Sequence, residues 1–158
     1  MGSVLASSTS RMILGLGETG RSVARWFVTH DIPFLATDTR SEQLSAPDVL
    51  EAVGSPDRLV SADKVPELMG SLTELVVSPG ISLEHPWVAL AREAGARILG
   101  DIDLFAAEVT APVVGITGSN GKSTVAALLA QMIAACGKQV GLGGNIGPPA
   151  LNIVDENV

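Results

Sequence analysis

The sequence predicts an α/β fold, with a Rossmann-like parallel-sheet domain followed by the beginning of a P-loop domain. Short apolar runs alternate with amphipathic helical segments along most of the chain, and this alternation is typical of parallel strands joined by helical crossovers. Two of the apolar runs lead through a glycine-rich turn directly into a helix, at residues 15–20 and 118–123. Each of these turns has a pattern that binds phosphate groups.

The first domain is predicted to contain short strands separated by short helices. The strands are expected at residues 11–14, 34–37, 58–61, 75–77 and 97–99. The helices are expected from the first glycine turn to about residue 29, and at residues 48–53, 63–69, 86–95 and 101–109. Asp63 and Asp101 stand where a side chain can cap the first turn of a helix. Trp26, Trp87 and Phe105 fall on inner helix faces and are expected in the core.

A second domain is predicted after the Thr110-Ala111-Pro112 segment, which is the best candidate for a linker. Strands are expected at residues 113–116 and 139–141. The helix between them, at residues 123–136, carries an apolar stripe at the helical period, formed by Val125, Leu128, Leu129, Met132, Ile133 and Cys136. We therefore expect a flexible N-terminus (1–10), a Rossmann-like domain (11–110) and the truncated start of an ATP-binding domain (111–158). Since two strands do not complete a sheet, the chain is expected to be the N-terminal part of a longer protein.

The composition disfavours several classes of partner and site. The chain has a net charge of -7 and an isoelectric point of about 4.7, so it repels the phosphate backbone of nucleic acid. No apolar run approaches the ~20 residues of a membrane span, and a secretory signal is not expected. The single cysteine, Cys136, excludes an internal disulfide and fits a cytoplasmic location. The spacing of His30 and His85 does not suggest a transition-metal site.

The turn at residues 118–123 reads Gly-Ser-Asn-Gly-Lys-Ser, between a predicted strand and a predicted helix. Glycines let several backbone N–H groups converge on one anion at the start of a helix. Lys122 can then reach the outer phosphates of ATP, and the Ser123 hydroxyl can ligate Mg²⁺. The standard pattern has a further glycine where this chain has Ile116. The alternative is a flexible glycine turn with a surface lysine.

The turn at residues 15–20 reads Gly-Leu-Gly-Glu-Thr-Gly, a G-x-G-x-x-G pattern. Asp38 closes the next strand, near the spacing of about 20 residues at which an acidic residue binds the ribose of a dinucleotide. A nicotinamide or flavin dinucleotide and another nucleotide are both compatible, because the turn recognises phosphate and not the base. Glu18, a carboxylate beside the expected pyrophosphate, and the Asp38-Thr39-Arg40 trio weaken the redox alternative. A further alternative is that the glycines serve only tight helix–strand packing.

Six short motifs, taken in order, resemble the Mur ligases, the ATP-dependent amide-forming enzymes of peptidoglycan synthesis. They are residues 15–20 (GLGETG), 38–40 (DTR), 78–81 (SPGI), 100–105 (GDIDLF), 116–123 (ITGSNGKS) and 143–147 (GGNIG). Each motif is weak alone, but the ordered set is specific and extends over nearly the whole chain from Arg11. The loop of this family also lacks the first glycine of the standard pattern, which accounts for Ile116.

The resemblance implies that the first domain binds the UDP end of a substrate and that the second binds ATP and Mg²⁺. The implied UDP-substrate residues are Gly17, Glu18, Thr19, Asp38, Thr39, Arg40, Ser78, Pro79, Gly80 and, near the domain junction, Asn145. The implied ATP-binding residues are Gly118, Ser119, Asn120, Gly121, Lys122, Ser123 and Thr124. Lys122 would be the catalytic residue and Ser123 the Mg²⁺ ligand, and no protein nucleophile is needed.

The substrates that the resemblance implies are UDP-N-acetylmuramoyl-L-alanine and glutamate. ATP would phosphorylate the carboxylate of the UDP substrate, and the amine of D-glutamate would then attack the acyl phosphate. Two alternatives stay open, an NAD(P)-dependent oxidoreductase built on the first glycine turn and a non-catalytic module that binds UDP-sugars. The oxidoreductase alternative leaves Lys122 and Ser123 unexplained. We expect no ligase activity from the chain alone, a monomeric parent protein, and self-association of a truncated copy.

Overall fold

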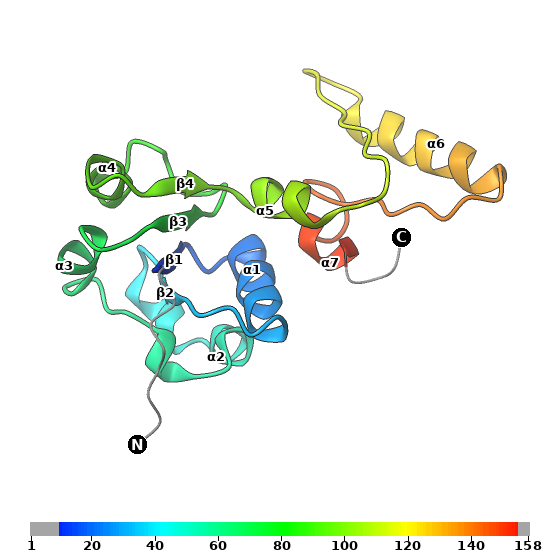
Figure 1. Cartoon of the computed structure of the whole chain (residues 1–158). Coiled ribbons are helices and arrows are strands. Elements are labelled where there is room, and N and C mark those ends of the chain that lie inside the picture. Colours follow the sequence, from blue (N-terminus) through cyan, green and yellow to red (C-terminus); the bar gives the residue numbers. More distant parts are fainter. Residues whose placement is uncertain (1–9, 155–158) are drawn as a thin grey trace. The chain divides into compact units, whose positions relative to one another are not determined.

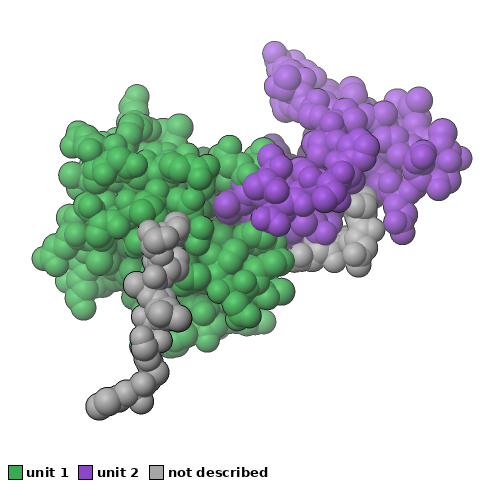
Figure 2. Space-filling view, in the orientation of Figure 1, with its two compact units in different colours: residues 1–103 green, residues 104–158 purple. Residues whose placement is uncertain are grey.

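The structure, a computed structural model, describes residues 10–154. The chain divides into two compact units, Met1–Asp103 and Leu104–Val158 (Figure 2). The division falls inside helix α5 (Asp101–Glu108), ahead of the predicted linker at residues 110–112. The expected flexible N-terminus lies outside the described residues except for Ser10, whose carbonyl oxygen accepts hydrogen bonds from the N–H groups of Thr73 and Glu74.

A four-stranded parallel sheet with the strand order β2-β1-β3-β4 forms the centre of the first unit (Figure 1). Its strands are β1 (Arg11–Leu14), β2 (Leu35–Thr37), β3 (Glu74–Val77) and β4 (Arg97–Leu99). The chain moves outward in one direction from β1 to β2 and in the other from β3 to β4. The neighbouring ends of β1 and β3 are therefore the topological switch point, where open α/β sheets bind their ligands.

Several helices of the first unit begin at a proline or are followed by a glycine. The helices are α1 (Glu18–Thr29), α2 (Pro47–Val53), α3 (Val65–Met69) and α4 (Pro86–Glu93), with short 3-10 turns η1 (Ser41–Ser45) and η2 (Pro56–Arg58). Proline occupies the first or second position of α2, α3 and α4, where its missing N–H leaves no bond unmade. Gly54 ends α2 and Gly95 follows α4, both with left-handed backbone.

The core of the first unit is divided by the sheet. Met12 and Leu14 of β1 and Leu75 and Val77 of β3 belong to one buried cluster with residues of α3 and α4. The alternate residues of each strand face the other side, where α1 packs on β1 and α2. Burial of each such side chain contributes about 1.5–3 kcal/mol, so apolar packing on both faces holds the strand ends in place.

Several local expectations for the first unit are wrong. Residues 58–61 do not form a strand, because the turn at η2 leaves only one bridge, between Ala36 and Leu59. Asp63 does not cap α3, whose N-cap is Lys64; no side chain bonds to the first turn of this helix. At α5 the capping carboxylate belongs to Asp103, which accepts from the Gly100 N–H at 2.7 Å, and not to Asp101. Phe105 is half-buried and not a core residue.

The second unit contains α6 (Lys122–Ala135) and the short α7 (Ala150–Val154), and its described residues contain no strand. The strands expected at residues 113–116 and 139–141 are therefore not formed, since a strand needs a paired neighbour to satisfy its backbone groups. Without a sheet beneath it, the predicted inner face of α6 is open, and Leu128 and Met132 are 56% and 58% exposed. Cys136, expected at the buried end of this stripe, is also exposed.

Candidate functional site

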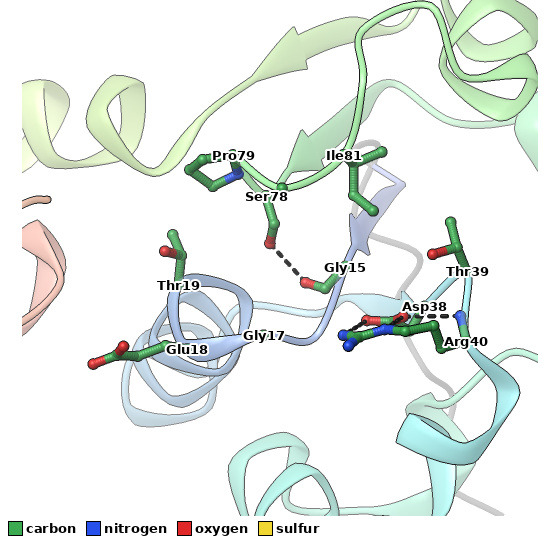
Figure 3. A pocket seen from close by; sticks show the side chains of 11 residues that line it. Gly15, Gly17, Glu18, Thr19, Asp38, Thr39, Arg40, Ser78, Pro79 and Ile81 are labelled. Atoms are coloured by element: carbon green, nitrogen blue, oxygen red, sulfur yellow. Dashed lines mark hydrogen bonds and ion pairs between the residues drawn. The ribbon is translucent and has the colours of Figure 1, made fainter.

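A cavity of about 440 Å³ opens at the carboxyl ends of β1, β2 and β3. Three loops form its wall, as Figure 3 shows, and the lining residues are Gly15, Gly17, Glu18, Thr19, Asp38, Thr39, Arg40, Ser78, Pro79, Gly80 and Ile81. The nine residues of the first unit that were predicted to bind a UDP substrate all line this one cavity. The tenth, Asn145, belongs to the second unit and is not among the lining residues.

The glycines of the first turn have different physical roles. Gly15 has a φ of +95°, and its carbonyl oxygen accepts a hydrogen bond of 2.7 Å from the Ser78 hydroxyl. A Cβ atom on Gly20 would lie 1.8 Å from that same carbonyl oxygen, so only glycine lets α1 approach the end of β1 this closely. A Cβ atom on Gly17 would meet no atom within 4 Å. Gly15 and Gly20 therefore serve packing, while Gly17 leaves space for a ligand.

Backbone N–H groups at the start of α1 are available to an anion. Among the described residues, the N–H groups of Gly17, Glu18 and Thr19 donate no hydrogen bond. The N-terminal end of a helix also carries a partial positive charge, which favours a bound phosphate. The Glu18 side chain points away from the Asp38–Arg40 pair (Figure 3).

Asp38 connects two of the three loops. Its side chain is 1% exposed, and one carboxylate oxygen accepts from the Leu16 N–H at 2.6 Å. The other oxygen accepts from the backbone N–H and from Nε of Arg40, at 2.9 and 3.1 Å. Burial raises the pKa of Asp38, but the hydrogen bonds from Arg40 and Leu16 outweigh it and lower the pKa below its ordinary value. The carboxylate is therefore ionised at neutral pH, and both of its oxygens are engaged.

Thr39 and Arg40 follow Asp38 on the open side of the same loop, and both are exposed. The guanidinium of Arg40 lies against Asp38 (Figure 3). Thr39 and Arg40 therefore both present polar groups to the cavity that they line.

The glycine turn of the second unit lies between an extended segment and α6. Gly118 and Gly121 have φ values of +144° and +75°, and the turn leads into a helix of 14 residues that begins at Lys122. The Lys122 ammonium group bends back and donates to the Gly118 carbonyl oxygen at 2.5 Å. Ser119, Asn120, Ser123 and Thr124 are exposed. The turn therefore combines the start of a helix, two glycines with positive φ and a lysine that spans the turn. These are the features of loops that bind phosphate groups.

Two residues of the second unit, Ser123 and Asn145, were expected to bind Mg²⁺ and the UDP substrate, respectively. Within residues 10–154, no set of three or more His, Cys, Asp or Glu side chains could hold a metal ion. The Ser123 hydroxyl fits as one ligand of a Mg²⁺ ion that takes its others from phosphate and water. Asn145 is exposed in a turn closed by a hydrogen bond of 2.9 Å from the Gly144 N–H to the Pro148 carbonyl oxygen.

Residues 9–100 match the family model "Mur ligase MurD-like, N-terminal domain". This chain belongs to the MurD-like Mur ligases. The match covers more than half of the chain and contains every residue that lines the cavity.

Curated relatives of this MurD-like chain are named UDP-N-acetylmuramoylalanine--D-glutamate ligase. The protein from Pseudomonas aeruginosa is 41% identical over 99% of this chain and 35% of its own length. Those from Legionella pneumophila and Marinobacter nauticus are 42% and 45% identical, over 92% and 98% of this chain and 32% and 34% of theirs. The MurD-like chain thus spans about a third of the length of these relatives.

Among solved structures, that of RSP in complex with beta-NADH has a TM-score of 0.45 and 9% identity, over 80% of this chain and 61% of the other. A likeness this distant says nothing about the ligand of the MurD-like domain. The described part of the chain contains no helix long and apolar enough to cross a lipid bilayer.

Two lining residues of the MurD-like cavity, Gly15 and Ile81, were not among the predicted ligand residues. Both belong to motifs that were used to locate the site, but only their neighbours in these motifs were predicted to contact the ligand. A Cβ atom on Gly15 would lie 3.0 Å from Cγ1 of Ile81, so Ile81 closes the cavity over the glycine turn. No spacing rule reveals this contact, because it joins two loops far apart in the sequence.

Proposed function

We propose that this chain is the N-terminal part of an ATP-dependent amide ligase of peptidoglycan synthesis. The ligase joins D-glutamate to UDP-N-acetylmuramoyl-L-alanine through an acyl phosphate, and it acts in the cytoplasm. The family membership supports the reaction class, and the curated relatives carry the name of this ligase. The single observation that carries the role of the first unit is the convergence of the three predicted loops on one cavity.

In this proposal the cavity takes the uridine diphosphate end of the substrate. Its volume of about 440 Å³ lies within the range of about 300–1,000 Å³ that is common for small-molecule sites. The free N–H groups of Gly17, Glu18 and Thr19 would hold the diphosphate at the start of α1. Thr39 and Arg40 would contact the uracil, and the loop at residues 78–80 would border the sugar.

The state of Asp38 favours a UDP substrate over a nicotinamide dinucleotide. In a dinucleotide site of this type, an acidic residue after the second strand hydrogen-bonds the ribose hydroxyls. Asp38 stands at that place, but it is almost fully buried and its oxygens already hold Leu16 and Arg40. A ribose diol could reach this carboxylate only if the side chain left its buried position, so Asp38 acts as a link between loops in this proposal and not as a direct ribose ligand.

The second unit would contribute the ATP site. ATP, when bound with Mg²⁺, supplies the phosphoryl group that activates the substrate carboxylate. Lys122 would leave the Gly118 carbonyl oxygen and place its charge on the phosphates, where it stabilises developing negative charge. The N–H groups of residues 118–123 would cradle the phosphates, the Ser123 hydroxyl would ligate Mg²⁺, and Asn145 would contact the substrate. Because the chain spans about a third of the length of the curated ligases it matches, we infer that these 158 residues alone form no amide product.

Isothermal titration calorimetry on this chain tests the proposed ligand. UDP-N-acetylmuramoyl-L-alanine should bind saturably, UDP should compete with it, and NADH should not. Gly17→Ala should weaken binding because its methyl group enters the open side of the turn, while Gly70→Ala, another glycine with no atom near its Cβ position, should leave it unchanged. Saturable NADH binding that UDP does not disturb would replace this proposal with the oxidoreductase alternative.

A further inference from the structure

The guanidinium of Arg21 lies behind the glycine turn, on helix α1. Its Nη1 donates to the Leu16 carbonyl oxygen at 3.0 Å, and its Nε lies 3.4 Å from Oδ2 of Asp48 at the start of α2. Arg21 does not line the cavity. Its guanidinium is instead bound to the backbone of the glycine turn and to Asp48.

The backbone N–H and the carbonyl oxygen of Leu16 are hydrogen-bonded by side chains of opposite charge. The Asp38 carboxylate accepts from the Leu16 N–H at 2.6 Å, while Arg21 donates to the Leu16 carbonyl oxygen. The Leu16 side chain is fully buried, which fixes the residue at a third point. Leu16 is therefore immobilised from three directions, although it contributes no atom to the cavity wall.

The carbonyl oxygen that Arg21 holds belongs to the same peptide unit as the Gly17 N–H. In a trans peptide these two groups point in opposite directions, and the described residues contain no cis peptide bond. A carbonyl drawn away from the cavity toward Arg21 therefore directs the Gly17 N–H toward the cavity that Gly17 lines. The charged donor on the carbonyl also polarises the peptide and strengthens the N–H as a donor.

We propose that Arg21 is a positioning residue for the diphosphate of the substrate, acting through the Leu16–Gly17 peptide. Asp48 orients Arg21, and Asp38 holds the other side of Leu16. This inference rests on the proposed function, because it assigns the Gly17 N–H to a phosphate oxygen. It predicts that removal of the guanidinium weakens binding of ligands that carry the diphosphate and spares ligands that lack it.

Arg21→Met and Arg25→Met form a matched pair for the test. Both remove one positive charge from α1, but Arg25 is exposed, and within residues 10–154 no hydrogen bond or ion pair is recorded for its guanidinium; its carbonyl oxygen accepts from the Thr29 hydroxyl. The affinity of the full 158-residue chain for UDP and for uridine is measured by calorimetry, and the Gly17 amide resonance is followed by ¹⁵N–¹H NMR. Should the methionine variant not fold, Arg21→Gln, whose shorter side chain does not reach Leu16, provides the same comparison.

We expect Arg21→Met to lower the affinity for UDP about fivefold and that for uridine by less than about twofold. The Gly17 amide resonance should move in this variant without any ligand, and Arg25→Met should change none of these values. Equal losses for UDP and uridine, or an unmoved Gly17 resonance, would overturn the positioning role. If the wild-type chain binds neither ligand, the proposed function fails together with the phosphate assignment, whereas failure confined to the variant leaves the proposed function standing.

Discussion

The Asp38 carboxylate, at the end of β2, accepts a hydrogen bond of 2.6 Å from the Leu16 N–H in the turn that follows β1. Its other oxygen holds the backbone and side chain of Arg40. The Ser78 hydroxyl makes the corresponding link from the loop after β3 to the Gly15 carbonyl oxygen. The three loops of the cavity are thus joined by buried polar contacts, and the ionised state of Asp38 is part of that connection.

Asp38→Asn should reduce stability in a pH-dependent way. The pKa of Asp38 is lower in the folded chain than its ordinary value of 3.8, so the folded state favours the charged form. The resulting stabilisation is fully present above the ordinary pKa and is lost as the pH falls through the folded pKa. Loss of the charged acceptor should cost about 1–3 kcal/mol at pH 7, as measured by urea unfolding, and the difference from wild type should shrink below about pH 4.

Asp31→Asn is the control for that titration. Asp31 is exposed and has a positive φ of 53°, which asparagine also adopts, so this variant should follow the wild-type curve. If Asp38→Asn and wild type differed by the same amount at every pH, ionisation of the Asp38 carboxylate would make no contribution to stability.

Gly20→Ala should destabilise the first unit far more than Gly17→Ala. The added methyl group at position 20 would lie 1.8 Å from the Gly15 carbonyl oxygen, so α1 must move away from β1, at a cost of about 3 kcal/mol, the upper end of the usual range for overpacking. At position 17 the methyl group meets no atom, and the cost should stay below about 1 kcal/mol. Thermal and urea unfolding measure both. A well-folded Gly20→Ala variant would show that the close approach of helix and strand is not required.

Replacement of Leu128 and Met132 by glutamine should reduce self-association of the chain without reducing its stability. Both side chains are more than half exposed on α6, and exposed apolar patches promote association. Sedimentation velocity at rising protein concentration measures the effect, and Gln131→Ala, at an exposed position of the same helix, serves as the control. If the double variant unfolded at a clearly lower urea concentration, these side chains would be packed in solution.

The sequence was sufficient to locate the four strands of the first unit's sheet and the loops of its cavity, although it also predicted a strand at residues 58–61 that is not formed. Strands β1 to β4 were predicted within a residue of their bounds, because each is an apolar run ended by glycine, proline or a polar residue. The convergence of residues 17–19, 38–40 and 78–80 follows from their places after parallel strands, whose carboxyl ends share one edge. The packing role of Gly15 could not be predicted, because it depends on Ser78, which lies 63 residues away in the sequence.

The errors concern features that depend on distant partners. Residues 113–116 have the composition of a buried strand, but pairing is not a local property, and the described residues supply no strand beside them. The same holds for Leu59, which makes a single bridge to Ala36. The contact of Arg21 with Leu16 was also missed, because a helical arginine near a phosphate-binding turn gives no sign of whether it faces the ligand or the backbone.

The central claim is that three loops of the first unit form a uridine diphosphate site, and amide chemical-shift mapping during a UDP titration tests it most directly. The account predicts saturable shifts, largest in residues 15–20, 38–40 and 78–81, with the Gly17 amide among the most affected. Saturable shifts confined to residues 118–124, or no saturable shifts in the first unit, would contradict it.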